Sequence, residues 1–239
     1  MDIYRINSLG ELLAGNSYPG RGIVCGLSKS GTHAVFAYFI MGRSENSRNR
    51  IFVSDGETVT IYPYDEAKVE DPSLIIYSPV RKLGDKLIVT NGDQTDTVYD
   101  FLEKGKTFAE ALETREFEPD APNFTPRISA LLDFEKGFSY KLSILKSADA
   151  DGSACNRFTY SFTPVAGLGH FIHTYACDGN PIPTFSAEPE RVEIPDSIDG
   201  FFDEIWSNLN EQNKISLVVR YTELETGDTD EMLINRNGD

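Results

Sequence analysis

The amino-acid sequence predicts an α+β protein whose β-structure is largely antiparallel. Roughly ten short runs rich in β-branched and aromatic residues are typical of strands, whereas only two or three stretches have helical periodicity. Strands and helices do not alternate along the chain, as a parallel sheet with crossover helices would require. The 239 residues are 40% hydrophobic and 11% aromatic, enough to bury a sizeable core. Because no repeat, low-complexity tract or linker is present, we expect a single domain over residues 1–239.

Turn residues divide the first part of the chain into hairpins. Asp55-Gly56 is the strongest such signal, because this pair suits a tight turn between antiparallel strands. Ser28 to Gly31 and Gly84-Asp85 are further turn candidates. The β-branched and apolar runs around these turns cover residues 23–27, 33–41, 50–54, 58–62, 74–77 and 86–90.

Helical signals follow in two places. Capping residues at 93–97 precede an apolar run, which predicts a helix from there, and Thr107 with Glu110 has the spacing of a capping box. A further helix is expected over residues 196–209, whose apolar side chains share one face. Residues 116–126 are expected to form an acidic, proline-containing loop before the next strand. The remaining expected strands are 127–134, 138–145, 157–164, 171–176, 215–224 and 231–234, the last two as a hairpin.

The charge of the chain is strongly acidic but unevenly distributed. Lys and Arg number 22 against 38 Asp and Glu, a formal net charge of −16, yet residues 1–50 alone carry a net charge of +3. A net-acidic surface repels the nucleic-acid backbone, so we expect no nucleic-acid partner. The local basic segment suits one compact anion such as a phosphate, although arginines at solvated strand ends would give the same pattern.

Several common chemistries lack their sequence signals. There is no P-loop, dinucleotide fingerprint or nucleophile elbow. His170 and His173 stand three apart on an expected strand and would point to opposite faces, so we expect no metal site. Cys25, Cys155 and Cys177 fit no disulfide framework and are expected to be buried.

Hydropathy indicates a cytoplasmic protein that does not enter membranes. The longest apolar run, residues 34–41, is too short to span a bilayer as a helix. The first residues include charged side chains and do not form the apolar region of a secretory signal. The sequence leaves homo-oligomerisation open.

Four polar clusters lie at the ends of expected strands, where a binding site on a β-scaffold is usually built. They span residues 18–22, 42–50, 90–96 and 123–127. The second combines guanidinium, hydroxyl and amide donors suited to phosphate oxygens. The third lies where a helix begins and offers free backbone N–H groups. Each cluster, taken alone, is also what turns and helix caps require.

These clusters carry a resemblance to a known family. The segments are Tyr18-Pro-Gly-Arg-Gly22, Ala37-Tyr-Phe-Ile-Met-Gly-Arg-Ser-Glu-Asn-Ser-Arg-Asn-Arg50, Ile76-Tyr-Ser-Pro-Val-Arg81, Val89-Thr-Asn-Gly-Asp-Gln-Thr-Asp96 and Thr125-Pro-Arg-Ile128. In this order they resemble the archaeal-type IMP cyclohydrolase family. Asp178-Gly-Asn-Pro181 and Glu188-Pro189 resemble its longer bacterial members. The resemblance covers residues 18 to 190, and the C-terminal residues beyond it carry no recognised motif.

The resemblance implies an Ntn-hydrolase-like fold, a four-layer αββα sandwich of two largely antiparallel sheets flanked by helices. It implies a hydrolase of purine biosynthesis, an IMP cyclohydrolase that closes 5-formamidoimidazole-4-carboxamide ribonucleotide to IMP with loss of water. The small ribonucleotide would be its binding partner, and neither a cofactor nor a metal is implied.

The same matching positions suggest roles for individual residues. Catalysis is assigned to Tyr77, Asp93 and Arg127. Substrate binding is assigned to Arg21, Arg43, Ser44, Asn49, Arg50, Asn91 and Thr125. Tyr77 and Arg127 would donate hydrogen bonds to the developing oxyanion, and Asp93 would orient the carboxamide or accept its proton. Tyr77 could equally be a core tyrosine, and Asp93 a plain N-cap.

Two other functions stay open at this level. One is a catalytically silent module that binds purine nucleotides. The other is an Ntn-type amide hydrolase, which would need a freed N-terminal Cys, Ser or Thr, whereas Asp2 follows Met1 here.

Overall fold

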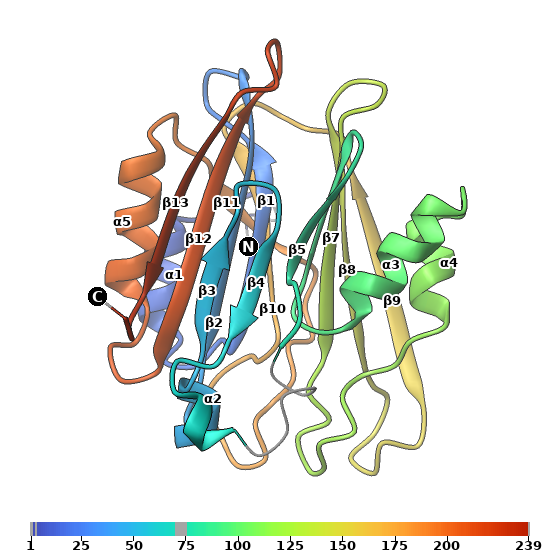
Figure 1. The fold of residues 1–239 in the computed structure, drawn as a ribbon, viewed down its shortest axis with the longest axis vertical. Helices are drawn as coiled ribbons and strands as arrows, with labels where there is room; N and C mark the ends of the chain where they lie inside the picture. Colours follow the sequence, from blue (N-terminus) through green and yellow to red (C-terminus); the bar gives the residue numbers. More distant parts are fainter. Residues whose placement is uncertain (1, 3, 70–75, 239) are drawn as a thin grey trace.

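The computed structural model describes residues 2, 4–69 and 76–238. Within them, the strands form two antiparallel sheets (Figure 1). The six-stranded sheet has the order β11-β10-β1-β2-β12-β13. Its strands are β1 (Arg21–Leu27), β2 (His33–Met41), β10 (Leu168–His173), β11 (Glu190–Glu193), β12 (Lys214–Glu223) and β13 (Thr229–Asn235).

The seven-stranded sheet keeps its strands in chain order, from β3 to β9. They are β3 (Ile51–Ser54), β4 (Val59–Tyr62), β5 (Val80–Leu83), β6 (Lys86–Thr90), β7 (Arg127–Asp133), β8 (Ser139–Ser147) and β9 (Cys155–Phe162). The helices are α1 (Leu9–Gly15), α2 (Glu45–Arg48), α3 (Gln94–Glu103), α4 (Phe108–Glu113) and α5 (Ile198–Asn208), with a 3₁₀ turn at Glu66–Lys68.

The two sheets stack face to face, and the side chains of each strand alternate between the core that they enclose and the outer face. On β1, Ile23 and Cys25 lie in the core between the sheets, whereas Val24 faces the opposite side. That opposite side is covered by α1 and α5, whose Leu13 and Phe201 belong to the same buried cluster as Val24.

Helices α3 and α4 cover the outer face of the seven-stranded sheet (Figure 1). Val98 and Phe108 pack there against Ile88 and Leu131 of β6 and β7. The expected capping box of α4 is confirmed, because Thr107 accepts from the backbone N–H of Glu110 while the Glu110 side chain bonds back. The molecule is therefore layered as helix, sheet, sheet and helix.

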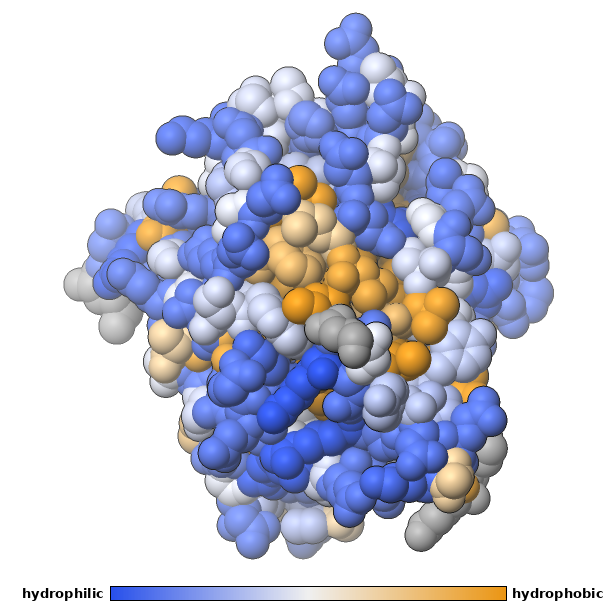
Figure 2. All heavy atoms as spheres, turned by 60° about the vertical axis from the view of Figure 1, so that its left-hand side comes forward, coloured by the Kyte–Doolittle hydropathy of each residue, from blue (hydrophilic) through white to orange (hydrophobic). Residues whose placement is uncertain are grey.

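The two sheets are joined at one flank by a single amide side chain. β3 and β13 are edge strands of different sheets and pack against each other. Asn235 accepts a hydrogen bond from the Phe52 N–H (2.7 Å) and donates one to the Phe52 carbonyl (3.0 Å). The Asn235 side chain therefore takes the place of a neighbouring strand at Phe52. Figure 2 turns this flank forward and shows apolar side chains near its middle.

Most expected elements are confirmed, and the differences have physical causes. Residues 74 and 75 lie outside the described residues, while Ile76 and Tyr77 are not in a strand; the strand begins at Val80 instead. β10 begins earlier than expected, at Leu168. The short helices α1 and α2 and the four-residue strand β11 were not predicted.

No helix in the described part of the chain is long and apolar enough to cross a membrane.

Candidate active site

A cavity of about 580 Å³ lies where strands of both sheets begin or end. It is lined by Arg21, Arg50, Tyr77, Asn91, Gly92, Asp93, Glu118, Pro119, Asp120 and Arg127. Arg21 opens β1 and Arg127 opens β7, while Arg50 directly precedes β3 and Asn91 directly follows β6. Six of the ten residues predicted for the site therefore converge on one cavity, although they come from five separate segments. We call this the arginine cavity.

Arg21 and Arg50 place two largely buried guanidinium groups side by side. Among the residues that the structure describes, neither forms a salt bridge, and the buried Nε of each lacks a hydrogen-bond partner. Burial and the neighbouring charge of Arg21 lower the pKa of Arg50. Burial opposes the charge of Arg21 as well, but the Glu118 carboxylate and nearby tyrosines outweigh it and raise the pKa of Arg21. Unused donors on paired cations favour an anionic ligand.

Tyr77 contributes a neutral hydroxyl to the cavity. Burial raises the pKa of Tyr77, although the charges of Arg50 and Arg21 act against the rise. Its hydroxyl donates to the Asn91 carbonyl at 2.8 Å. Behind it, Tyr38 is fully buried, and its hydroxyl has no partner in the described part of the chain.

Arg127 is held at one end of its guanidinium group. Its Nη1 lies 2.7 Å from Asp93 Oδ1 and 2.7 Å from Gln94 Oε1. Gly92 allows this arrangement, because a Cβ at that position would lie only 2.5 Å from Arg127 Nη1.

Asp93 occupies the N-cap position of α3 but makes no capping hydrogen bond with its side chain. Its carboxylate instead bridges Arg127 and Arg115, whose Nη2 lies 2.5 Å from Asp93 Oδ2. Burial alone would raise the pKa of Asp93, but the two arginines outweigh it and lower the pKa. Asp93 is therefore a firmly ionised group, which makes it a weak proton acceptor.

Two further predicted residues have polar groups that are already engaged. The Asn91 side chain accepts from the Ile128 N–H at 2.9 Å and donates to the Pro126 carbonyl at 2.9 Å. Thr125 does not line the cavity, and its hydroxyl bonds to Asp120 and to the Tyr175 hydroxyl. Both residues thus hold the loop before β7 in place.

The structure places Arg43, Ser44 and Asn49 away from the lining of the arginine cavity. Arg43 binds Asp178 at 2.6 Å and lies over the Tyr18 ring. Ser44 caps α2, and the Asn49 side chain pairs with the backbone of Asp65. The residues of the arginine-rich segment therefore divide, with Arg50 in the cavity and these three outside it.

Glu118, Pro119 and Asp120 line the cavity but were not predicted. Burial raises the pKa of Glu118 more than the charges of Arg21 and Arg127 lower it. The sequence shows only an acidic loop here, and nothing in its pattern indicates that Glu118 faces the arginines. The signal is topological, because the loop must return from α4 to the start of β7.

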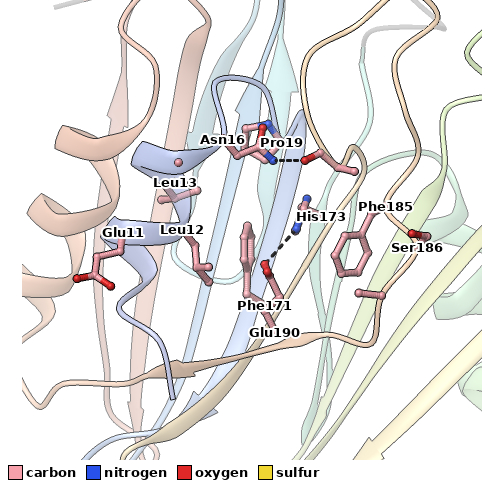
Figure 3. A pocket seen from close by; sticks show the side chains of 13 residues that line it. Glu11, Leu12, Leu13, Asn16, Pro19, Phe171, His173, Phe185, Ser186 and Glu190 are labelled. Atoms are coloured by element: carbon pink, nitrogen blue, oxygen red, sulfur yellow. Dashed lines mark hydrogen bonds and ion pairs between the residues drawn. The ribbon is translucent and has the colours of Figure 1, made fainter. Parts of the chain in front are cut away.

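A second hollow of about 390 Å³ lies beside α1 on the outer face of the six-stranded sheet (Figure 3). We call it the outer pocket. Its buried His173 faces the Tyr175 carbonyl with Nδ1 (2.8 Å) and Glu190 with Nε2 (3.2 Å). Asn16 donates to the carbonyls of Tyr175 and Ala176. These polar groups are thus satisfied within the protein.

The histidines and cysteines separate as follows. His170 bonds to Tyr140 at 2.7 Å, whereas His173 contacts Glu190, so the expected placement on opposite faces is confirmed. Cys25 is buried as expected, but Cys177 is exposed because it lies in a loop after β10. Within the described ranges, no three His, Cys, Asp or Glu side chains group closely enough to hold a metal ion.

Comparison with known proteins agrees with the expected family. The sequence profile of the family described as "IMP cyclohydrolase-like protein" matches residues 18–228, which extends the resemblance through β12. An IMP cyclohydrolase of Methanopyrus kandleri is 34% identical over 122 residues, 49% of this chain and 60% of that protein. One of Methanococcus maripaludis strain C7 is 31% identical over 175 residues, 63% of this chain and 82% of that protein.

A third relative, an IMP cyclohydrolase of Methanococcus aeolicus, is 27% identical over 165 residues, covering 67% of this chain and 75% of that protein. The matched part spans less than two thirds of the Methanopyrus relative, but more of the two Methanococcus proteins. The family profile covers most of the chain, including every residue that lines the arginine cavity. The chain therefore belongs to the IMP cyclohydrolase-like family.

Proposed function

We propose that this protein is an IMP cyclohydrolase, which closes 5-formamidoimidazole-4-carboxamide ribonucleotide to IMP with loss of water. The observation that carries the proposal is the arginine cavity itself. It unites two arginines with unused buried donors, a neutral tyrosine hydroxyl and a third, oriented arginine. The name shared by the relatives agrees with this chemistry.

The reaction is intramolecular, which sets what the protein must do. The carboxamide nitrogen attacks the formyl carbon on the same imidazole ring, forming the new C–N bond. The formyl oxygen then leaves as water with one proton from each of the two nitrogens. Since the reacting groups are already joined, the protein gains most by holding the rotamer in which they touch.

Arg21 and Arg50 are assigned to the phosphate and ribose. Their Nε atoms are buried and find no partner in the described part of the chain, and such donors are unfavourable unless a ligand satisfies them. Burial and the charge of Arg21 both lower the pKa of Arg50, and a phosphate dianion would offset both effects.

Tyr77 and Arg127 are assigned to the formyl oxygen as it gains negative charge. Both line the cavity, and burial keeps the Tyr77 hydroxyl protonated, so that it can donate to this oxygen by turning from the Asn91 carbonyl that it bonds in the structure. Preorganised donors of this kind contribute about 3 kcal/mol each to the transition state when well placed.

Glu118, rather than Asp93, is our candidate for the proton acceptor. Asp93 is stabilised as an anion by two arginines, which makes it a poor base. The pKa of Glu118 is raised by burial, so its carboxylate is the more basic of the two. Asp93 then serves to orient Arg127, and Asn91 serves to hold the loop that precedes β7.

The architecture fits the proposal at a coarser level. Two antiparallel sheets stack between helical layers, so we assign the Ntn-hydrolase-like fold. We also propose that residues 1–239 act as one domain, because Arg21 comes from one sheet and Arg127 from the other, and both line the same cavity.

The direct test mixes the purified protein with the formamido-carboxamide ribonucleotide and follows IMP by its ultraviolet absorbance. Turnover above the uncatalysed rate is expected, and Arg50→Ala should raise the KM for this substrate. Arg48→Ala is the matched control, because Arg48 lies in the same segment but bonds to Gly42 and Asn213 outside the cavity. Stabilisation by IMP without turnover would instead indicate a silent binding module. If the protein showed neither turnover nor stabilisation by IMP, the proposal would be wrong.

A further inference from the structure

Gln94, the first residue of α3, lies beneath the arginine cavity without lining it. Its side chain is fully buried. Its Oε1 accepts from Arg127 Nη1 at 2.7 Å, while its Nε2 donates to Asn91 Oδ1 at 3.0 Å and to the Ile128 carbonyl at 3.2 Å. Because donors and acceptors are thus matched, the amide has only one favourable orientation, with its oxygen toward Arg127.

These contacts use up one end of the Arg127 guanidinium. Nη1 donates a hydrogen bond to Gln94 and forms an ion pair with Asp93, both at 2.7 Å. Among the described residues, Nε and Nη2 of Arg127 have no hydrogen-bond partner. Three N–H donors therefore stay available on a guanidinium that lines the cavity.

Gln94 and Asp93 differ in how they can hold this arginine. The Asp93 side chain is 58% exposed and shares its charge with Arg115, so it is screened and can move with solvent. Gln94 is rigidly buried and carries no charge. Its oxygen fixes Arg127 without neutralising it, which leaves the positive charge for a developing oxyanion.

We infer that Gln94 is a positioning residue, which acts through Arg127 by aiming its free Nε and Nη2 donors at the reacting formyl oxygen. The inference rests on the proposed function, since it is the cyclisation that develops the charge. It does not require Gln94 to touch the substrate.

A double-mutant cycle tests this inference. Gln94→Met keeps the side-chain length but removes the oxygen, and we expect a fall in kcat of about tenfold with KM changed less than threefold. In an Arg127→Ala background, the same change should have no further effect on kcat. Equal losses in both backgrounds would show a merely structural role and overturn the inference.

Two comparison variants distinguish a loss of folding stability from a loss of Arg127 positioning. Asn235→Leu removes another amide with several hydrogen bonds far along the chain, so it should cost stability without lowering kcat. Gln94→Glu keeps an acceptor for Arg127 but adds a charge and loses the donor toward Asn91. It should retain the KM of the parent protein and lower kcat less than Gln94→Met if holding Arg127 is what matters.

A second readout does not depend on turnover. The Arg127 Nε–H group should be well ordered by nitrogen-15 relaxation in the parent protein and mobile in Gln94→Met. Unchanged order would overturn the inference. If the parent protein shows no cyclisation, the proposed function fails, while the relaxation data still decide whether Gln94 holds Arg127.

Discussion

The arginine cavity and the outer pocket are both lined by charged and aromatic residues, yet their polar groups are used differently. In the outer pocket, the side chains of His173 and Asn16 form hydrogen bonds with neighbouring protein atoms (Figure 3). In the arginine cavity, the buried Nε donors of Arg21 and Arg50 have no partners among the residues that the structure describes.

This difference indicates which hollow is built for a ligand. A buried donor without a partner destabilises a fold by about 1–3 kcal/mol, so chains rarely retain several together unless they serve function. The size of a hollow gives no such indication, because a hollow whose polar groups are satisfied gains little by binding. The contrast can be tested by changing residues in each region.

The largest effect is expected from Glu118→Gln, because a general base contributes about 10²–10⁴-fold. In the parent protein, kcat/KM should fall as the pH falls through the Glu118 pKa, since only the carboxylate accepts a proton. Burial raises that pKa, so the acid limb should lie above the usual range of a glutamate. A pH–rate profile of both proteins checks this. An unaltered acid limb in Glu118→Gln would assign the base elsewhere.

Tyr77→Phe should lower kcat by about 100-fold while KM changes little, because it removes one donor to the oxyanion. Steady-state kinetics give the split. The fold should tolerate the change, since Tyr77 donates only one side-chain hydrogen bond, to the Asn91 carbonyl. A rise in KM alone would place Tyr77 in substrate binding instead.

Arg50→Ala should raise KM by at least tenfold, because it removes a charged donor from the phosphate. Arg43→Ala offers a sharp contrast within the same motif. Arg43 pairs with Asp178 outside the cavity, so its loss should change KM less than threefold. Equal effects of both substitutions would mean that the phosphate reaches beyond the arginine cavity.

The smallest effect is expected in the outer pocket. Glu190→Gln keeps the shape of the side chain and an acceptor for His173, so kcat and KM should stay within twofold of the parent values. Thermal unfolding should shift by only a few degrees. A kinetic effect as large as that of Tyr77→Phe would break the contrast between the two regions.

Local sequence signals predicted most of the fold. The site was harder to predict, because it depends on contacts between segments that are distant in the sequence. The Asp55-Gly56 turn and the Thr107 capping box are encoded by neighbouring residues, and both are confirmed. Convergence of Arg21, Arg50 and Arg127 could be expected only from the family resemblance. Glu118 was missed because its place in the cavity depends on the path of the loop that returns from α4 to the start of β7.

Arg43 shows the opposite limit, since motif position alone cannot tell two arginines of one segment apart. Both belong to the same basic stretch, but the chain turns through α2 between them. Only the three-dimensional path separates the residue that enters the cavity from the one that binds Asp178.

The order of strands in the two sheets has a consequence for how the protein is made. β3 to β9 follow one another along the chain, so the seven-stranded sheet can assemble while the ribosome is still extending the polypeptide. The six-stranded sheet cannot, because β2 must wait for β12 to emerge before it gains its second neighbour. Arg21 belongs to the sheet that waits and Arg127 to the sheet that does not. The nascent chain should therefore complete the arginine cavity late, in one step, when the C-terminal hairpin docks.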